Sequence, residues 1–242
     1  MYKIIEKIKK KQENLKENAP ITIVCIGDSI TQGCFECYMK TPTALETVFD
    51  YNSAYSTRLR ELFALLYPNV QVNVINSGIS GDNALGGLAR LERDVFYYNP
   101  DLVIVSFGLN DSYGGPERLY LYTDALEKIF KQLAERNIDC IFLTENCMNT
   151  VVSCHLKEEK LIEVAKDYSR VQNAGFVELY FETAKKVCEK YSVKVCDMYP
   201  IWKTMEQSGI EVTELLANKL NHPIREFHYY IAIKLLEIIL FG

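Results

Sequence analysis

A serine stands at a sharp turn near the start of the chain, directly after an apolar run. Residues 21–26 read Ile-Thr-Ile-Val-Cys-Ile, which predicts a strand buried on both faces of a sheet. Gly27, Asp28 and Ser29 follow; glycine permits a turn, and aspartate and serine are common at helix starts. In open α/β sheets, ligands bind at the carboxyl ends of the strands. Ser29 is therefore either a helix cap without chemistry or a hydroxyl at a ligand-binding edge.

Other polar groups are expected at the same edge. Residues 78–82 follow the second predicted strand, Asn110 follows the third, and His222-Pro223 precedes the last predicted helix. Taken singly, Gly81 is typical of a turn, Asn110 of a cap and His222 of a structural histidine. Their combination with Ser29 at successive strand ends indicates a functional site.

The elements that position these groups alternate between strands and helices. The sequence predicts strands over residues 21–26, 70–75, 101–107, 140–144 and 193–196. It predicts helices near residues 53–66, 84–98, 116–137, 156–191 (interrupted at Gly175), 201–207 and 224–240. Such alternation predicts a parallel sheet of about five strands with helices on both faces, a three-layer α/β/α sandwich.

The ends of the chain and one internal stretch depart from this alternation. Residues 1–19 are expected to form an amphipathic helix packed on a single domain over residues 20–242. Residues 34–51 lack clear periodicity and are expected to form a loop beside the site. A dinucleotide-binding fold would need G-x-G-x-x-G after the first strand, and residues 27–33 do not supply it.

Four short motifs occur in the order in which the SGNH, or GDSL, hydrolases use them, and together they span most of the chain. The motifs are Gly27-Asp28-Ser29, Ile79-Ser80-Gly81-Asp82, Gly108-Leu109-Asn110-Asp111 and His222-Pro223. The chain thus resembles this family. The resemblance implies a flavodoxin-like α/β/α fold and a serine esterase that needs no cofactor or metal.

The resemblance also implies a role for each motif. Ser29 is the expected nucleophile, and His222 the base that takes its proton. The backbone N–H groups of Ser29 and Gly81 and the side-chain amide of Asn110 are the expected oxyanion donors. Pro223 suits the first position of a helix, which would place His222 at a positive helix end that favours the neutral imidazole.

One residue departs from the family pattern. The last motif is usually D-x-x-H, but Lys219 stands three residues before His222, and lysine cannot accept the imidazole N–H. The imidazole is then oriented by a backbone carbonyl, by Asn218 or by Glu214. A Ser–His dyad is the resulting expectation.

The expected substrate is a small acyl ester, with an O-acetylated carbohydrate suggested by family analogy. Two alternatives stay open at this point. One is a non-catalytic or degenerate carbohydrate- or acyl-binding protein on the same fold. The other is an acyltransferase that uses the same covalent intermediate.

The composition limits the classes of binding partner that are expected. The 242 residues carry a net charge of −5, which argues against nucleic-acid binding, and no apolar run approaches the roughly 20 residues of a membrane helix. The lysine-rich start lacks an apolar core, so a cytoplasmic protein with mostly reduced cysteines is expected. Oligomeric state is left open.

The cysteines and two remaining histidines are weaker candidates. Cys34 and Cys37 could form half of a zinc site, but the possible partners have irregular spacing: Cys147, Cys154 and His155. No metal is therefore predicted. His155 is a candidate for lining the site, and His228 is expected to pack or to face solvent. Asp28 and Asp111 are expected to bond loop N–H groups.

Overall fold

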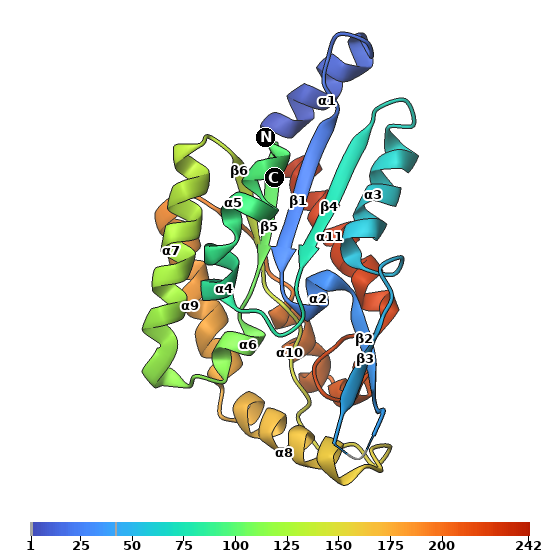
Figure 1. The fold of residues 1–242 in the computed structure, drawn as a ribbon, viewed down its shortest axis with the longest axis vertical. Helices are drawn as coiled ribbons and strands as arrows, with labels where there is room; N and C mark the ends of the chain where they lie inside the picture. Colours follow the sequence, from blue (N-terminus) through green and yellow to red (C-terminus); the bar gives the residue numbers. More distant parts are fainter. Residues whose placement is uncertain (1, 42) are drawn as a thin grey trace.

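The computed structural model describes residues 2–41 and 43–242 and contains a sheet of five parallel strands in the order β4-β1-β5-β6-β7 (Figure 1). Its strands are β1 (Ile21–Gly27), β4 (Val72–Gly78), β5 (Leu102–Ser106), β6 (Asp139–Leu143) and β7 (Lys194–Cys196). In chain order this is the arrangement 2-1-3-4-5 of flavodoxin-like folds. The predicted α/β class, strand number and parallel sheet are confirmed.

Helices cover both faces of the sheet. The longer ones are α1 (Lys3–Glu13), α3 (Tyr55–Leu66), α7 (Leu119–Glu135), α8 (Glu159–Asn173), α9 (Phe176–Tyr191), α10 (Tyr199–Gln207) and α11 (Arg225–Phe241). The short ones are α2 (Ser29–Gln32), α4 (Ala84–Ala89), α5 (Leu91–Asp94), α6 (Leu109–Ser112), η1 (Phe96–Tyr98), η2 (Pro116–Arg118) and η3 (Val212–Leu215). None of the described helices is both long and apolar enough to span a membrane.

Alternate side chains of the strands pack into two separate hydrophobic cores, one on each face of the sheet. In β1, Ile23 and Cys25 pack with α1, α3 and α11, whereas Val24 and Ile26 pack with α4, α7 and α9. All four side chains are fully buried. This burial on both faces explains why the strand is a continuous apolar run.

Three strands end at the same level. Gly27 is in register with Gly78 of β4 on one side and with Ser106 of β5 on the other. The turns that follow these residues therefore leave the sheet side by side. This register brings the first three motifs to one edge.

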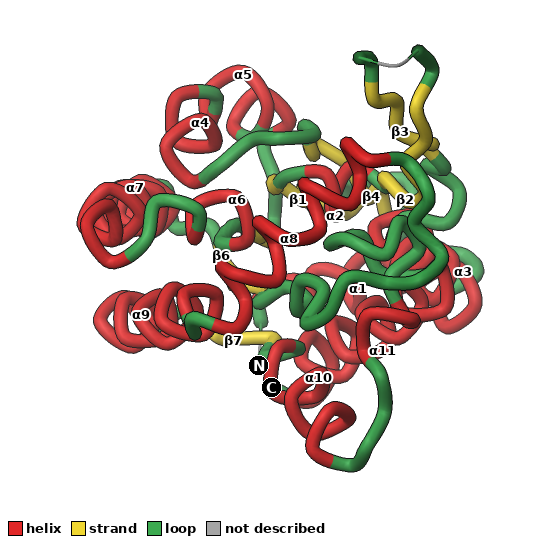
Figure 2. Tube along the Cα trace, turned by 90° about the horizontal axis from the view of Figure 1, so that it is seen from below, coloured by secondary structure: helices red, strands yellow, loops and turns green. Residues whose placement is uncertain are grey.

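The prediction that residues 34–51 form a loop is wrong. This segment forms an antiparallel hairpin of β2 (Cys34–Met39) and β3 (Leu45–Phe49), which projects beside the carboxyl edge of the sheet (Figure 2). A register shift between Cys34 and Cys37 interrupts the alternation, and β3 is not fully buried on either face. A strand pattern in the sequence is therefore weak.

The prediction of a single helix over residues 84–98 is also wrong. It breaks at Arg90, whose backbone leaves the helical region, so that α4, α5 and η1 follow in succession. The Arg90 guanidinium donates to the carbonyl oxygens of Gly27 (2.9 Å) and Ser77 (2.6 Å). A buried arginine thus ties the ends of β1 and β4 together.

Candidate active site

The turn after β1 presents Ser29 at the first position of α2. The Asp28 carboxylate caps this helix by accepting a hydrogen bond from the backbone N–H of Ile30 at 2.9 Å. Asp28 and Ser29 are both buried. Asp28 therefore bonds a backbone N–H of a helix and not of a loop as predicted, and it fixes the backbone that carries the Ser29 hydroxyl.

The loop before α11 presents His222. The side-chain oxygen of Asn218 accepts hydrogen bonds from the N–H groups of Leu220, Asn221 and His222, at 2.9–3.0 Å. A β-bridge between Leu216 and Pro223 closes this loop. Asn218 thus holds the backbone of the loop and does not orient the imidazole.

His222 does not stand at the first turn of a helix. Helix α11 begins at Arg225, with Ile224 as its N-cap. The prediction that Pro223 takes the first helical position is therefore wrong. The bridge to Leu216 keeps Pro223 in extended backbone. The helix dipole therefore has less effect on His222 than expected.

The serine and the histidine meet, although 193 positions separate them. His222 Nε2 lies 3.0 Å from Ser29 Oγ, and His222 Nδ1 lies 3.0 Å from the backbone oxygen of Phe35. A carbonyl only accepts, so Nδ1 carries the proton and Nε2 faces the serine as an acceptor. Burial lowers the pKa of His222 to about 4, an effect that the Phe35 hydrogen bond partly offsets. The imidazole is neutral near pH 7.

The backbone carbonyl is thus the group at Nδ1 among the three alternatives raised by the sequence. Lys219 has a positive φ of 59° and its Nζ donates to the backbone oxygen of Glu214 at 2.7 Å. The Glu214 carboxylate pairs with Lys219 at 3.0 Å. The Lys219 and Glu214 side chains therefore bond each other, and the Phe35 carbonyl is the group that bonds the imidazole.

Two side chains pack against the ring of Phe35. The Arg225 guanidinium lies 4.3 Å from the ring centroid, and the His228 ring lies 4.7 Å from it. Arg225 also donates to Glu36 at 3.0 Å and to Asp50 at 2.9 Å. His228 is buried and packed, one of the two outcomes expected from the sequence. These contacts fix the residue whose carbonyl orients the base.

The loop after β4 supplies a free backbone donor. Its Ile79 N–H bonds the carbonyl of Gly27 at 3.0 Å, and its Ser80 N–H bonds the Gln32 side chain at 2.6 Å. Gly81 has a φ of +79°, and a Cβ at this position would meet no atom within 4 Å, so glycine is needed there for conformation and not for space. In the described part of the chain, the backbone N–H groups of Ser29 and Gly81 form no hydrogen bond with a protein acceptor.

Asn110 lies at the same edge but its amide is engaged. Its Nδ2 donates to the Asp28 carboxylate at 2.9 Å and to the backbone oxygen of Asp82 at 2.8 Å. Asn110 therefore joins the first three motifs to one another. Its role as an oxyanion donor stays a prediction, because one of these bonds must open first.

Acidic groups gather behind these donors. Asp111 accepts from the backbone N–H of Ala84 at 3.1 Å, as predicted for a structural residue, and burial raises its pKa to about 7. Burial also raises the pKa of Asp28 to about 6. Glu145, which follows β6, is buried and accepts from the backbone N–H of Leu109 at 3.0 Å. The sequence motifs did not single out Glu145, although it directly follows the strand predicted over residues 140–144.

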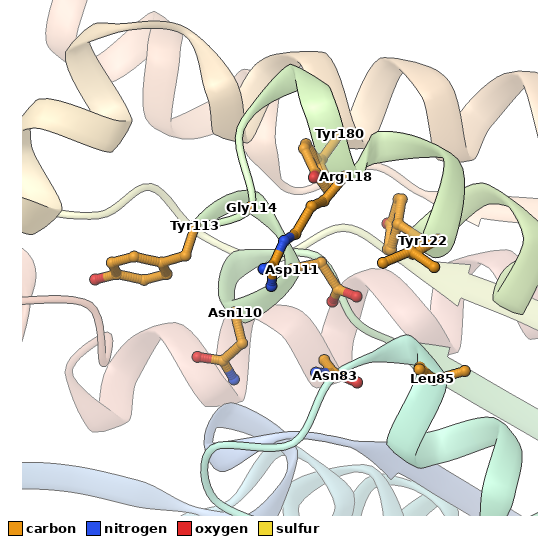
Figure 3. Close-up of a pocket in the computed structure, with 10 residues that line it drawn as sticks. Asn83, Leu85, Asn110, Asp111, Tyr113, Gly114, Arg118, Tyr122 and Tyr180 are labelled. Carbon is orange, nitrogen blue, oxygen red and sulfur yellow. The ribbon is translucent and has the colours of Figure 1, made fainter.

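A pocket of about 520 Å³ opens next to Asn110 (Figure 3). Its walls come from the start of α4, from residues 110–118 and from α7 and α9. Tyr113 and Leu85 are exposed at the pocket, and Arg118 reaches into it. The pocket offers both apolar faces and hydrogen-bond donors beside the candidate oxyanion site.

The cysteines and His155 were the weaker candidates. Burial raises the pKa of the Cys34 thiol to about 12, and Cys37 accepts from Asn218 at 3.6 Å. His155 is exposed, with Nε2 3.7 Å from Glu214. Within residues 2–41 and 43–242, no three His, Cys, Asp or Glu side chains converge as metal ligands would.

Several residues of the site left no usable signal in the sequence. The carbonyl of Phe35 belongs to the backbone, so the residue type does not mark it. Arg90 and Arg225 act through contacts with distant segments. Glu145 could have been found, because it follows a predicted strand at the same edge as Asn110.

Two curated proteins are similar in sequence to part of this chain. An acetylxylan esterase of Geobacillus stearothermophilus is 30% identical over 116 residues, which are 46% of this chain and 51% of the relative. An arylesterase of Vibrio mimicus is 46% identical over 52 residues, 22% of this chain and 26% of the relative. The chain therefore matches about half, or less, of the length of these relatives.

Solved structures share the fold. A crystal structure of an acetyl xylan esterase superposes with a TM-score of 0.65 at 17% identity, covering 90% of this chain and 100% of that one. A two-domain esterase active on acetylated mannans gives 0.67 at 18% identity, covering 96% and 52%. The profile of the GDSL-like lipase/acylhydrolase family matches residues 25–228. That span holds the four motifs and most of the chain, and this protein belongs to the GDSL-like lipase/acylhydrolase family.

Proposed function

We propose that the protein is a serine esterase that removes small acyl groups, with acetyl groups on a carbohydrate as its substrate class. The observation that carries the proposal is the 3.0 Å contact between Ser29 Oγ and His222 Nε2, with Nδ1 bonded to Phe35. The carbohydrate part rests on the relatives, which are named for acetylated xylan and mannan.

The proposed reaction has two stages. His222 takes the proton of Ser29 while Oγ attacks the ester carbonyl, and the resulting oxyanion accepts from the N–H groups of Ser29 and Gly81. Asn110 joins them once its amide releases Asp82. The protonated His222 then gives its proton to the departing alcohol, which leaves an acyl group on Ser29.

Water completes the cycle. His222 takes a proton from a water molecule that attacks the acyl group, and then returns the proton to Ser29 as the carboxylic acid leaves. The pocket beside Asn110 is the proposed place for part of the substrate, because its rim carries Tyr113 and Leu85.

Hydrolysis of p-nitrophenyl acetate tests the chemistry. Ser29→Ala is expected to lower kcat by at least about 1000-fold, since loss of the nucleophile removes the whole two-stage pathway. Ser208→Ala, an exposed serine at the end of α10, is the matched control and should retain full activity. Equal background rates for the wild type and Ser29→Ala would refute the esterase and favour a binding protein.

Acetylated xylo- and manno-oligosaccharides test the substrate class. Acetate release from either, lost in Ser29→Ala, supports the proposal. Turnover that rises when an alcohol acceptor is added would instead identify an acyltransferase.

A further inference from the structure

An arginine in the pocket beside Asn110 has no partner among the described residues. Six of the eight arginines of the chain pair with a carboxylate at 2.5–3.9 Å. Within residues 2–41 and 43–242, Arg60 and Arg118 form no such ion pair, and the Arg118 guanidinium has no hydrogen-bond acceptor either. Arg60 is exposed on α3, whereas Arg118 lines the pocket.

The turn before Arg118 seats its side chain against the pocket. Arg118 is the last residue of η2, and a Cβ added at Gly114 would lie 2.7 Å from Arg118 Cβ and 3.2 Å from Arg118 Cδ. The aliphatic part of the arginine therefore lies directly on Gly114, where a larger residue would displace it. From there the guanidinium extends towards the turn that carries Asn110 and Asp111 (Figure 3).

The charged donors of the pocket come from Arg118. Among the described residues that line the pocket, it is the only cation. Two tyrosine hydroxyls also lie there, but both are already bonded: Tyr122 donates to the carbonyl of Phe107 at 2.9 Å, and Tyr180 to that of Gly115 at 2.8 Å. The guanidinium therefore offers the pocket charged N–H groups that the protein itself does not use.

The acid of the same pocket does not neutralise Arg118. Asp111 accepts from the backbone N–H of Ala84 at 3.1 Å, and it forms no ion pair with Arg118 in the described structure. Burial raises the pKa of Asp111 to about 7, so that part of this acid is uncharged at neutral pH. An anion that enters the pocket therefore meets the positive charge of Arg118 and a reduced negative charge on Asp111.

The chemistry of the guanidinium indicates which anion fits. Arginine binds a carboxylate through parallel N–H···O bonds, and one guanidinium balances the single charge of one carboxylate. A phosphate group brings more negative charge than this one cation balances, beside the Asp111 carboxyl. A carboxylate is therefore the anion that the pocket suits best.

The pocket is close enough to the nucleophile for one substrate to occupy both. Asn110 lines the pocket, and its amide lies 2.9 Å from the carboxylate of Asp28, the residue before Ser29. We propose that Arg118 is a specificity-determining residue that binds the carboxylate of an acetylated uronic acid while Ser29 attacks an acetyl group of the same sugar. This proposal rests on the esterase function proposed above and narrows its carbohydrate class to acidic sugars.

Acetylated glucuronic acid and the corresponding acetylated glucuronamide form a matched pair of substrates. Both carry the same acetyl groups on the same ring, and only the acid offers a carboxylate. The ratio of kcat/KM for acetate release, acid over amide, should fall about tenfold in Arg118→Gln, because a charge-assisted pair is lost from a solvent-open pocket. Arg118→Lys keeps the charge but not the planar fork, so its ratio should lie between those of the wild type and Arg118→Gln.

Arg60→Gln is the matched control, because Arg60 is likewise exposed and without an ion pair among the described residues but does not line the pocket. Its ratio should equal that of the wild type, and circular dichroism checks that each variant is folded. Equal ratios in the wild type and Arg118→Gln overturn the proposal. An equal fall in Arg60→Gln also overturns it, because the effect would then come from the overall charge of the protein.

Binding measurements separate this proposal from the esterase function. If the protein is no esterase, p-nitrophenyl acetate, which has no carboxylate, reacts equally with the wild type and Ser29→Ala. Calorimetric titration of Ser29→Ala with the same two sugars then reports the pocket without turnover. The acid should bind about tenfold more tightly than the amide, and the double variant Ser29→Ala/Arg118→Gln should lose this difference. Equal binding of the two sugars to Ser29→Ala, or binding of neither, refutes the carboxylate site.

Discussion

The base of the proposed dyad should stay active in acid far below the usual range of histidine. Neutral His222 is the form that accepts the Ser29 proton, and burial lowers its pKa to about 4. At about pH 5.5, an ordinary histidine of pKa about 6.5 would be about 9% neutral, whereas a pKa of about 4 leaves about 97% neutral. The expected kcat/KM at that pH is therefore about tenfold above that of an enzyme with an ordinary histidine.

The assay is the pH dependence of kcat/KM, which reports the free enzyme. Initial rates of acetate release from p-nitrophenyl acetate are measured between about pH 4 and 8 at constant ionic strength. We expect a nearly level profile down to about pH 5, with the fall in activity below it. An acid limb centred between about pH 6 and 7 contradicts this reasoning unless another group causes it.

Asp28 and Asp111 are such groups, because burial raises their pKa values to about 6 and about 7. Protonated Asp28 keeps an oxygen that can accept from Asn110, so we expect only a small effect. Asp28→Asn and Asp111→Asn each remove one of these titrations. A limb between about pH 6 and 7 that persists in both variants belongs to His222 and refutes the low pKa.

Folding must be followed in the same buffers. His222 and His228 are both buried, and burial lowers their pKa values to about 4 and about 3. Below the unfolded pKa of about 6.5 the unfolded chain binds more protons, so each histidine removes up to about 1.4 kcal/mol of stability per pH unit. Circular dichroism at each pH separates unfolding from loss of the base.

Two substitutions test what holds His222 in place. Arg225→Gln removes the cation over the Phe35 ring and its ion pairs, and should lower kcat about tenfold with KM unchanged. The control is Lys234→Gln in the same helix. Equal activity of the two variants would show that Arg225 does not hold Phe35 in place. Lys219→Asp restores the usual family residue but should not raise kcat/KM, because Nδ1 already faces the Phe35 carbonyl; a rise would show that the carboxylate can reach the imidazole.

The sequence was informative where a pattern is local. Residues 21–26 are apolar throughout because the strand is buried on both faces, and the turn at Gly27 follows from residue types alone. The order of the motifs identified Ser29, Gly81, Asn110 and His222 as one set, and the shared level of β1, β4 and β5 brings the first three together. The Ser29–His222 contact needed the whole fold.

Other features depend on contacts that composition and periodicity do not encode. The hairpin over residues 34–49 has partly exposed faces and a register shift, so its apolar pattern is weak. The bond from the Leu109 N–H to the Glu145 carboxylate joins the turn after β5 to the segment after β6, because β5 and β6 are neighbours in the sheet. Strand order, and not sequence spacing, decides that these two segments meet.

A carbonyl in place of a carboxylate separates two tasks that one residue usually performs. The Phe35 oxygen selects the tautomer and holds the ring, which needs only an acceptor in a fixed position. It carries no full charge, so it stabilises the imidazolium of the transition state less than an aspartate would. The same lack of charge leaves burial as the dominant influence on the pKa of His222 and keeps it low. The rigidity around Phe35, supplied by Arg225 and His228, therefore matters more here than in a triad, because orientation is the main help that the base receives.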